Sequence, residues 1–222
     1  MTDGIILIDK PAEMTSFGVV ARLRRLLSEQ QGKKVKVGHT GTLDPFATGL
    51  MIIVVGKECK NAELYSKKDK VYEATIRLGQ SSTTGDPEGE IIDDINAKVP
   101  PTNDEVKGVL AKFTGAITQR PPIYSAIKID GQRAYKLARE GKMPEMPERR
   151  ITIHSLELVD YTYPELKIRT HVSSGTYIRT LAEDIGRSLG TCAYCTELRR
   201  TAIGEWKIED AQTLQEFGVL NP

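Results

Sequence analysis

The chain has 222 residues, 27% charged and 39% hydrophobic, with 31 Lys and Arg against 30 Asp and Glu. This composition is typical of a globular protein and excludes predominant disorder, because a chain of this length buries roughly 70% of the surface exposed on unfolding. The longest apolar run, residues 50–55, is far shorter than the ~20 residues that span a bilayer. The first residues lack the basic and apolar pattern of a secretory leader, so we expect a cytoplasmic protein without membrane contact.

The nearly balanced net charge of +1 conceals two basic segments. Residues 19–36 carry six Lys and Arg against one Glu, and residues 120–150 carry eight against four acids. Residues 61–110 compensate with ten acids against six bases. Charge sorted in this way is typical of a face that binds a polyanion, although solvated helix faces give the same pattern. Charge alone leaves both interpretations open.

The first third of the chain predicts three strands and a helix. Residues 4–8 are apolar and indicate a short buried strand. Thr15 or Ser16 is a typical N-cap for a helix with apolar residues at helical spacing, namely Phe17, Val20, Leu23 and Leu27. Residues 50–55 form a continuous apolar run of strand length, and residues 71–78 alternate as a half-exposed strand does. We expect at most one short helix between these two strands.

The middle of the chain predicts a loop, a short strand and a well-capped helix. Residues 81–90 are rich in Ser, Thr, Gly and Asp and predict a loop, with a strand at 91–95 that pairs beside it. Thr102 and Glu105 form the capping-box pattern of a helix that runs to Phe113.

Residues 119–150 predict a basic arm inserted into the fold. A Pro pair, a strand to Ile129, an Asp130-Gly131 turn and an amphipathic helix closed by Gly141 follow one another there. After the arm, the sequence predicts antiparallel strands at residues 151–161 and 166–173 and a helix at 177–189. A further strand, a short element and a final helix at 211–217 complete the prediction. Strands outnumber helices and often follow one another directly. This order predicts one α+β domain, residues 1–222, with a mixed, mostly antiparallel sheet flanked by helices.

The densest chemical signal is the segment Gly38–Gly49, with three glycines, His39 and Asp44 between a basic segment and a predicted strand. Loops in such places commonly carry sites, and glycines let a ligand approach the backbone closely. Asp44 precedes Pro45, which keeps it out of the α region and suits it to cap a short turn. Turn capping explains Asp44 but not the glycines. A lone histidine such as His39 is more often a structural hydrogen-bonding group than a catalytic one.

A second signal is the segment 173–179, Ser-Ser-Gly-Thr-Tyr-Ile-Arg, where a predicted strand ends and a helix begins. Arg179 suits the partner of a buried carboxylate, because a guanidinium stays charged and can form two parallel hydrogen bonds. It equally suits an exposed surface position. Tyr72 lies early in a predicted strand, where tyrosine is common for packing reasons, so alone it indicates little.

Six motifs occur in the order found in one enzyme family. They are Asp9-Lys-Pro-x-x-x-Thr-Ser16, Gly38-His-Thr-Gly-Thr-Leu-Asp-Pro-x-Ala-Thr-Gly-Leu50, Lys70-x-Tyr72, Pro121-Pro-x-Tyr-Ser-Ala126, Gly175-Thr-Tyr-Ile-Arg179 and Leu198-Arg-Arg-Thr201. Through these motifs the chain resembles the TruB-type tRNA pseudouridine-55 synthases over nearly its whole length.

The resemblance implies the pseudouridine synthase fold and an isomerase that needs no cofactor and no metal ion. Such an enzyme detaches the uracil of the T-loop uridine at position 55 of tRNA from its ribose, rotates it and reattaches it through C5. Asp44 matches the family's nucleophile, which acts on a flipped-out uridine, and Arg179 matches the arginine that keeps this carboxylate ionised. The matched substrate-binding positions are His39, Tyr72, Tyr177 and Leu198. Tyr72 is also a candidate to move the ribose proton, whereas we expect His39 to stack on the RNA loop.

The resemblance also assigns a purpose to the basic segments. An RNA loop is recognised through phosphate contacts for position and extruded bases for specificity. Residues 119–150 match the arm that grips the T-loop, so we expect a monomer that binds the T-arm of tRNA. Family members usually continue into a small RNA-binding domain of the PUA type, and we expect no such C-terminal domain in these 222 residues.

The three cysteines predict reduced thiols, because their number is odd and their spacing gives no disulfide framework. The Cys192-x-x-Cys195 pair is not typical of the family at this place. Zinc requires two further ligands, and Cys59 and His154 stand alone in the sequence. We therefore expect Cys192 and Cys195 to be two packed thiols.

Two other functions fit parts of the sequence. A non-catalytic tRNA-binding or tRNA-folding factor would use the same basic surface, but Asp44, Tyr72 and Arg179 together favour catalysis. A phosphohydrolase with an aspartate nucleophile is suggested by Asp44 followed by Thr48-Gly49. The Mg²⁺-binding carboxylates that such enzymes need are missing near Asp44, which disfavours this alternative.

Overall fold

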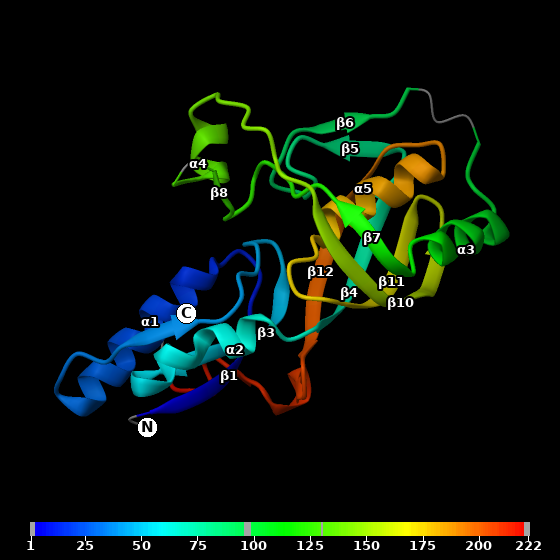
Figure 1. Cartoon of the computed structure of the whole chain (residues 1–222). Helices are drawn as coiled ribbons and strands as arrows, with labels where there is room; N and C mark the ends of the chain where they lie inside the picture. The colour runs from blue at the N-terminus through cyan, green and yellow to red at the C-terminus, as the bar shows by residue number, and fades with distance from the viewer. Residues whose placement is uncertain (1–2, 96–98, 130, 220–222) are drawn as a thin grey trace. The chain divides into compact units, whose positions relative to one another are not determined.

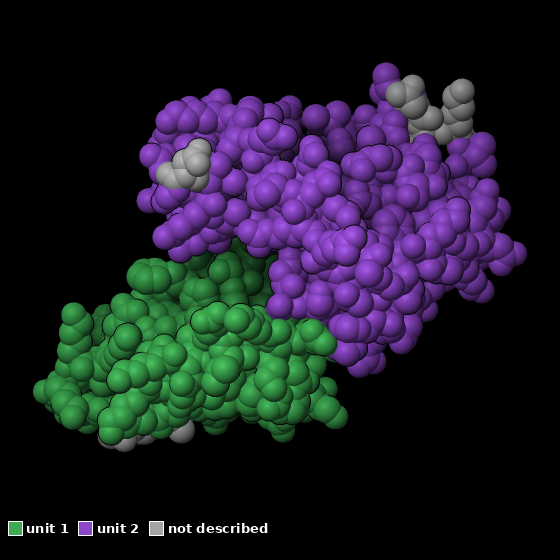
Figure 2. Space-filling view, in the orientation of Figure 1, with its two compact units in different colours: residues 1–73, 198–222 green, residues 74–197 purple. Residues whose placement is uncertain are grey.

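The computed structural model describes residues 3–95, 99–129 and 131–219, and Figure 1 shows the path of the chain. The chain forms two compact units, coloured separately in Figure 2. Unit 1 comprises residues 1–73 and 198–222, and unit 2 comprises residues 74–197. Among the described residues, no helix combines the length and the apolar character needed to cross a membrane.

Unit 1 is built on a sheet whose strand order is β14-β1-β3-β12. Its main strands are β1 (Gly4–Lys10), β3 (Thr48–Val55) and the end of β12 (Ala193–Ile203). β3 pairs antiparallel with β1 and parallel with β12. Residues 50–55 of β3 are at most 1% exposed, because a strand covered on both faces is apolar throughout. The predicted strands 4–8 and 50–55 are confirmed.

The other elements of unit 1 are short apart from one long helix. They are α1 (Ser16–Gln31), β2 (Val37–His39), η1 (Gly56–Asn61), α2 (Ala62–Ser66), the start of β4 (Lys70–Leu78), β13 (Trp206–Lys207), η2 (Ile208–Asp210) and β14 (Gln212–Thr213). The prediction of at most one short helix between β3 and β4 holds for the α-helices, because η1 is a 3-10 helix.

Helix α1 begins as predicted but buries a different face. Thr15 is its N-cap, and the Thr15 hydroxyl accepts a hydrogen bond from the Gly18 amide at 2.9 Å. Phe17, predicted on the buried face, is 64% exposed and lies 5.9 Å below the Arg24 guanidinium. The buried stripe is centred on Ser16, Leu23 and Leu27, and at 3.6 residues per turn Phe17 lies roughly a third of a turn away from it.

Unit 2 contains the strand order β12-β4-β11-β10-β7. β10 (Arg149–Thr162) and β11 (Glu165–Val172) form a long antiparallel hairpin, and β7 (Gly115–Gln119) pairs with the start of β10. The hairpin confirms the two predicted strands. Together with unit 1, this sheet confirms the α+β class with mostly antiparallel strands.

Two helices and a small hairpin complete the body of unit 2. Helix α3 (Asn103–Lys112) starts with the predicted capping box, and α5 (Ile178–Ser188) confirms the helix predicted over 177–189. β5 (Gln80–Ser82) pairs with β6 (Ile91–Asp93), so the predicted pairing strand is present, and the predicted loop begins within β5.

The arm of residues 119–150 projects from the end of β7 (Figure 1). Its elements are β8 (Lys128–Ile129), β9 (Gln132–Arg133) and α4 (Ala134–Arg139), so both the strand and the helix are shorter than predicted. Pro121 and Pro122 lack the amide hydrogens that a longer strand would need. The arm has a small apolar core of its own, made of Ile127, Ala134 and Met146. The predicted turn residue Asp130 lies outside the described residues.

The prediction of a helix at 211–217 is wrong. Strand β14 occupies residues 212–213, and a single turn follows it. Thr213 and Glu216 do form the reciprocal hydrogen bonds of a capping box, at 2.8 and 3.1 Å. Gly218 then adopts a left-handed conformation, with φ of 98°. The helix signal is therefore real, but a left-handed residue stops it after one turn.

Candidate active site

The segment Gly38–Gly49 links β2 to β3 and carries Asp44 on a tight turn. The Asp44 carbonyl accepts a hydrogen bond from the Ala47 amide at 3.2 Å. Pro45 stands at the second position of this turn, where its fixed φ is favourable. The predicted turn at Asp44 is therefore confirmed, and the Asp44 side chain is half-buried.

Two buried polar side chains hold the main chain on either side of Asp44. The Ser16 hydroxyl accepts a hydrogen bond from the Leu43 amide at 2.8 Å and donates one to the Leu43 carbonyl at 2.9 Å. The Lys10 ammonium, in a fully buried side chain, donates to the Pro45 carbonyl at 3.1 Å. Burying polar groups costs free energy unless they are hydrogen-bonded. These contacts therefore fix the path of the chain through Asp44.

Arg200 of β12 connects both ends of the same segment. Its side chain is 1% exposed, and it donates to the Leu50 carbonyl at 2.8 Å and to the Gly41 carbonyl at 3.2 Å. Gly49 has φ of 108°, and a Cβ added there would lie 2.3 Å from the Arg200 carbonyl oxygen. Glycine is required at this position because the two backbones approach so closely.

Unit 1 contains four of the six predicted site residues. His39 ends β2, Asp44 lies in the turn, Tyr72 lies on β4 and Leu198 lies on β12. Tyr72 and Leu198 are each 8% exposed. Lys70, two residues before Tyr72, is 7% exposed and donates to backbone carbonyls at the end of α2.

Lys70 should give the stability of the protein a pH dependence in alkali. Burial, and secondarily the charge of Arg200, lowers the pKa of the Lys70 ammonium to about 8 from 10.5. The folded protein loses this proton at a lower pH than the unfolded chain does, so the free energy of unfolding rises between these two pKa values. The rise should be at most about 3 kcal/mol. Urea unfolding between pH 7.5 and 10.5 should show this rise in the parent and not in Lys70→Met; an equal rise in both proteins would contradict the prediction.

Unit 2 contains the other two predicted site residues, Tyr177 and Arg179. Arg179 lies in the first turn of α5 and is 4% exposed. Its guanidinium donates to the carbonyls of Thr84 at 2.6 Å and Tyr124 at 2.8 Å, and it pairs with the Asp86 carboxylate at 3.0 Å. The Asp86 side chain is also 4% exposed. These oxygen atoms replace the water that would hydrate the guanidinium at the surface.

The main chain of Tyr177 is held by the side-chain amide of Gln119. Gln119 is 2% exposed; its oxygen accepts from the Tyr177 amide at 2.8 Å, and its nitrogen donates to the Tyr177 carbonyl at 3.0 Å. The Tyr177 ring packs against the apolar core of the arm, defined above as Ile127, Ala134 and Met146. The arm and the start of α5 are therefore packed together within unit 2.

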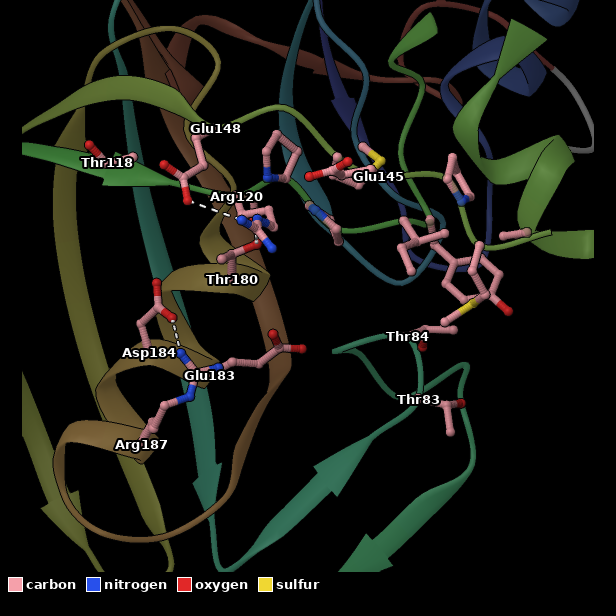
Figure 3. A pocket seen from close by; sticks show the side chains of 18 residues that line it. Thr83, Thr84, Thr118, Arg120, Glu145, Glu148, Thr180, Glu183, Asp184 and Arg187 are labelled. Carbon is pink, nitrogen blue, oxygen red and sulfur yellow. Dashed lines mark hydrogen bonds and ion pairs between the residues drawn. The ribbon is translucent and has the colours of Figure 1, made fainter. Parts of the chain in front are cut away.

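A groove of about 840 Å³ is lined by residues of the arm and of α5, as Figure 3 shows. Two ion pairs line it, Arg120 with Glu148 at 3.1 Å and Arg187 with Asp184 at 2.8 Å. Burial raises the pKa of the neighbouring Glu183 carboxyl. The groove is mixed in charge and differs in this respect from the outer surface of the arm.

All eight basic residues of the arm are exposed: Arg120, Lys128, Arg133, Lys136, Arg139, Lys142, Arg149 and Arg150. Two of these eight form ion pairs with acidic residues that the structure describes: Arg120 with Glu148 and Lys142 with Glu140. The arm therefore presents an excess of positive charge to solvent.

The two cysteines predicted to be packed thiols differ in their surroundings. Cys195 is fully buried as predicted, whereas Cys192 is exposed, so the prediction of a packed thiol is wrong for Cys192; among the described residues neither forms a disulfide. Burial, and then the charge of Asp94, raises the pKa of the Cys192 thiol. Within the described ranges, neither cysteine belongs to a cluster of three or more possible metal ligands. His154 is not isolated in the fold, because its ring lies 4.6 Å from that of His171.

Comparison with known proteins identifies the family. Residues 24–178 match the N-terminal domain of TruB family pseudouridylate synthases, and residues 179–220 match the tRNA pseudouridylate synthase B C-terminal domain. The chain belongs to the TruB family. The tRNA pseudouridine synthase B of Aromatoleum aromaticum is 47% identical over 220 residues, covering 99% of this chain and 69% of that protein. The enzyme of the same name from Opitutus terrae is 43% identical, covering 98% and 88%.

Solved structures agree with this family. A Cbf5–Nop10–Gar1 complex matches with a TM-score of 0.69 at 29% identity, covering 96% of this chain and 52% of that chain. The archaeal box H/ACA sRNP Nop10–Cbf5 complex matches with a TM-score of 0.68 at 28% identity, covering 96% and 51%. The chain thus spans about half the length of these solved chains. The predicted pseudouridine synthase fold is confirmed, and this TruB family chain is an enzyme that isomerises uridine in tRNA to pseudouridine.

Two buried residues of the TruB family chain escaped the sequence analysis. Asp86 lies in the Ser- and Thr-rich stretch predicted as a loop. Gln119 was predicted only as the first residue of the arm. Asp86 precedes Pro87, as Asp44 precedes Pro45, and this shared dipeptide was the available signal. No local pattern marks Gln119, because its partner is a backbone 58 residues away.

Proposed function

We propose that this TruB family enzyme converts the T-loop uridine at position 55 of tRNA to pseudouridine, with Asp44 as the nucleophile. The observation that carries the proposal is the turn at Asp44. A half-buried carboxylate stands there on a main chain held by Ser16 and Lys10. Such a fixed acidic side chain, in a glycine-rich loop, is suited to attack a bound substrate without prior reorganisation.

The proposed reaction needs an ionised carboxylate and no cofactor. Asp44 attacks the flipped-out nucleotide and holds one fragment while the glycosidic bond to N1 breaks and the uracil turns. The bond from C5 to the ribose then forms and the bond to Asp44 breaks, which regenerates the carboxylate, while the C5 proton is lost and N1 gains a proton. Arg179 supplies the positive charge that favours the ionised form of Asp44. Tyr72 packs beside the uracil and is the candidate to move the ribose proton, and His39, Tyr177 and Leu198 contact the nucleotide.

The proposed partner is the T-arm of tRNA, gripped by the arm of residues 119–150. The eight exposed Lys and Arg side chains of residues 119–150 supply contacts to the RNA phosphates. One relative of known structure, 27% identical with a TM-score of 0.68, is an H/ACA RNP bound to a substrate RNA containing 2'-deoxyuridine. In our proposal the two units act together as one catalytic domain, in a cytoplasmic monomer.

The test is to incubate the protein with an unmodified tRNA transcript and to map pseudouridine along the product. We expect one pseudouridine, at position 55, with no added cofactor and with EDTA present once the RNA has folded. A transcript with cytidine at position 55 is the matched control and should remain unmodified. An isolated T-arm stem-loop should also be modified, and its failure to react would contradict the T-arm assignment. Tight tRNA binding without any product would instead favour the non-catalytic folding factor.

The arm should supply much of the affinity for tRNA. Lys128→Glu combined with Lys136→Glu reverses two exposed charges of the arm. This variant should bind tRNA at least about tenfold more weakly, and the slope of log K against log salt should flatten by roughly 1.4 to 1.8. The single-turnover rate at saturating tRNA should change much less. Lys107→Glu with Lys112→Glu makes the same charge change on α3, outside the arm, and an equal loss of affinity there would contradict the role of the arm.

A further inference from the structure

Ser16 uses its side chain on a distant loop although it lies at a helix terminus. It is the first residue of α1 and is 3% exposed. Thr15 already provides the N-cap, through its 2.9 Å contact with the Gly18 amide. The Ser16 hydroxyl instead accepts from the Leu43 amide and donates to the Leu43 carbonyl, 27 residues away. A hydroxyl has one hydrogen to donate, and this hydrogen is committed to the Leu43 carbonyl.

We propose that Ser16 is a positioning residue for Asp44, acting through the main chain of Leu43. The Leu43 carbonyl belongs to the peptide group that joins Leu43 to Asp44, and a peptide group is planar. Fixing this carbonyl therefore fixes the orientation of the peptide plane that contains the Asp44 nitrogen and Cα. On the other side, the Asp44 carbonyl closes the turn with Ala47 at 3.2 Å. The direction of the Asp44 Cα–Cβ bond, from which the carboxylate extends, is then set from both sides, with Pro45 restricting the backbone of Asp44 further.

This inference rests on the proposed role of Asp44 as the nucleophile. Geometry of this kind matters for rate, because a displacement of 1 Å at a reacting group can lower a rate about a hundredfold. A purely structural role for Ser16 is the competing interpretation, since Leu43 is itself 3% exposed and its buried backbone groups need partners. Both interpretations predict a loss of stability, and they differ in their effect on the chemical step.

The experiment compares Ser16→Ala with Thr15→Ala in the full chain. Both variants remove a hydroxyl from the N-terminus of α1, and each breaks a hydrogen bond to a backbone amide. Both should lower the melting temperature. Ser16→Ala should lower the single-turnover rate at saturating tRNA by about tenfold to a hundredfold, with the Kd for tRNA unchanged. Thr15→Ala should keep the rate within about twofold of the parent, because its hydrogen bond does not involve the loop of Asp44.

Ser16→Thr keeps the hydroxyl and should restore most of the rate. If Ser16→Ala does not fold, Ser16→Cys replaces it, because a thiol is a weak hydrogen-bonding group and should give the same loss of rate. Equal rates for the Ser16 and Thr15 variants would overturn the inference. Asp44→Asn, measured alongside, distinguishes a failure of the Ser16 role from a failure of the proposed function. If that variant is inactive while Ser16→Ala reacts normally, only the role of Ser16 fails. If Asp44→Asn still turns over, the proposed function fails and the role of Ser16 with it.

Discussion

Asp44→Asn should abolish pseudouridine formation, lowering the single-turnover rate by at least about a thousandfold. The substitution removes the nucleophilic charge with almost no change in volume. The hydrogen bonds that shape the turn use main-chain atoms of Leu43, Asp44 and Pro45, so they persist in the variant. We therefore expect the variant to fold as the parent does. Affinity for tRNA should be equal or slightly higher, because a negative charge is removed beside a polyanion.

The measurement is single-turnover mapping of pseudouridine at saturating tRNA, with binding measured separately by filter retention. Asp160→Asn is the matched control, because Asp160 is exposed on β10 in unit 2. It should react at the rate of the parent. Product formation by Asp44→Asn within about tenfold of the parent would remove Asp44 from the role of nucleophile.

Elements with local signals were predictable from the sequence. The capping residues Thr15 and Thr102 mark the starts of α1 and α3, because N-cap side chains bond to amides only two or three residues away. The hairpin of β10 and β11 follows from alternating residues on either side of a Pro turn. The glycine-rich segment before β3 was recognisable for a similar reason, since its glycines and Asp44 lie within twelve residues.

Contacts between distant residues were not predictable from the pattern. Arg179 bonds to Thr84, 95 residues earlier, and Ser16 bonds to Leu43, 27 residues later. Periodicity reports which face of an element is apolar, and it does not report which polar groups meet inside the fold. The sequence therefore predicted that Arg179 suits a carboxylate partner, but it did not identify Asp86 as one.

The two units place their expected site residues by the same physical means. In unit 1 the Ser16 hydroxyl holds the amide and the carbonyl of Leu43, next to Asp44. In unit 2 the Gln119 side chain holds the amide and the carbonyl of Tyr177. In each case one buried side chain fixes a main chain through two hydrogen bonds. The main chain beside each residue expected to meet the RNA is therefore held by a buried side chain from another part of the same unit.

Asp86→Ala should destabilise unit 2 strongly, by about 3–5 kcal/mol. It removes the carboxylate that pairs with the Arg179 guanidinium at 3.0 Å, where both side chains are 4% exposed. Two other oxygen partners, the carbonyls of Thr84 and Tyr124, carry no net charge. Asp86 also accepts hydrogen bonds from the Thr84 hydroxyl at 2.6 Å and the Glu88 amide at 3.0 Å. Both bonds are lost, so the turn that presents Thr84 to Arg179 should loosen as well.

Asp184→Ala is the matched control. Asp184 lies on α5, as Arg179 does, and pairs with Arg187 at 2.8 Å, where Arg187 is 74% exposed. An arginine at the surface recovers its hydration when its partner is removed, so this loss should cost less than about 1 kcal/mol. Urea unfolding of both variants at low and at high salt measures the difference.

Asp86→Asn, which keeps the volume and part of the hydrogen bonding, should fall between Asp86→Ala and Asp184→Ala in stability. In that variant the pseudouridine yield should drop even at temperatures where the protein is folded, because the orientation of Arg179 depends on the charge of Asp86. Equal losses of stability for Asp86→Ala and Asp184→Ala would show that the buried pair contributes no more than an exposed one.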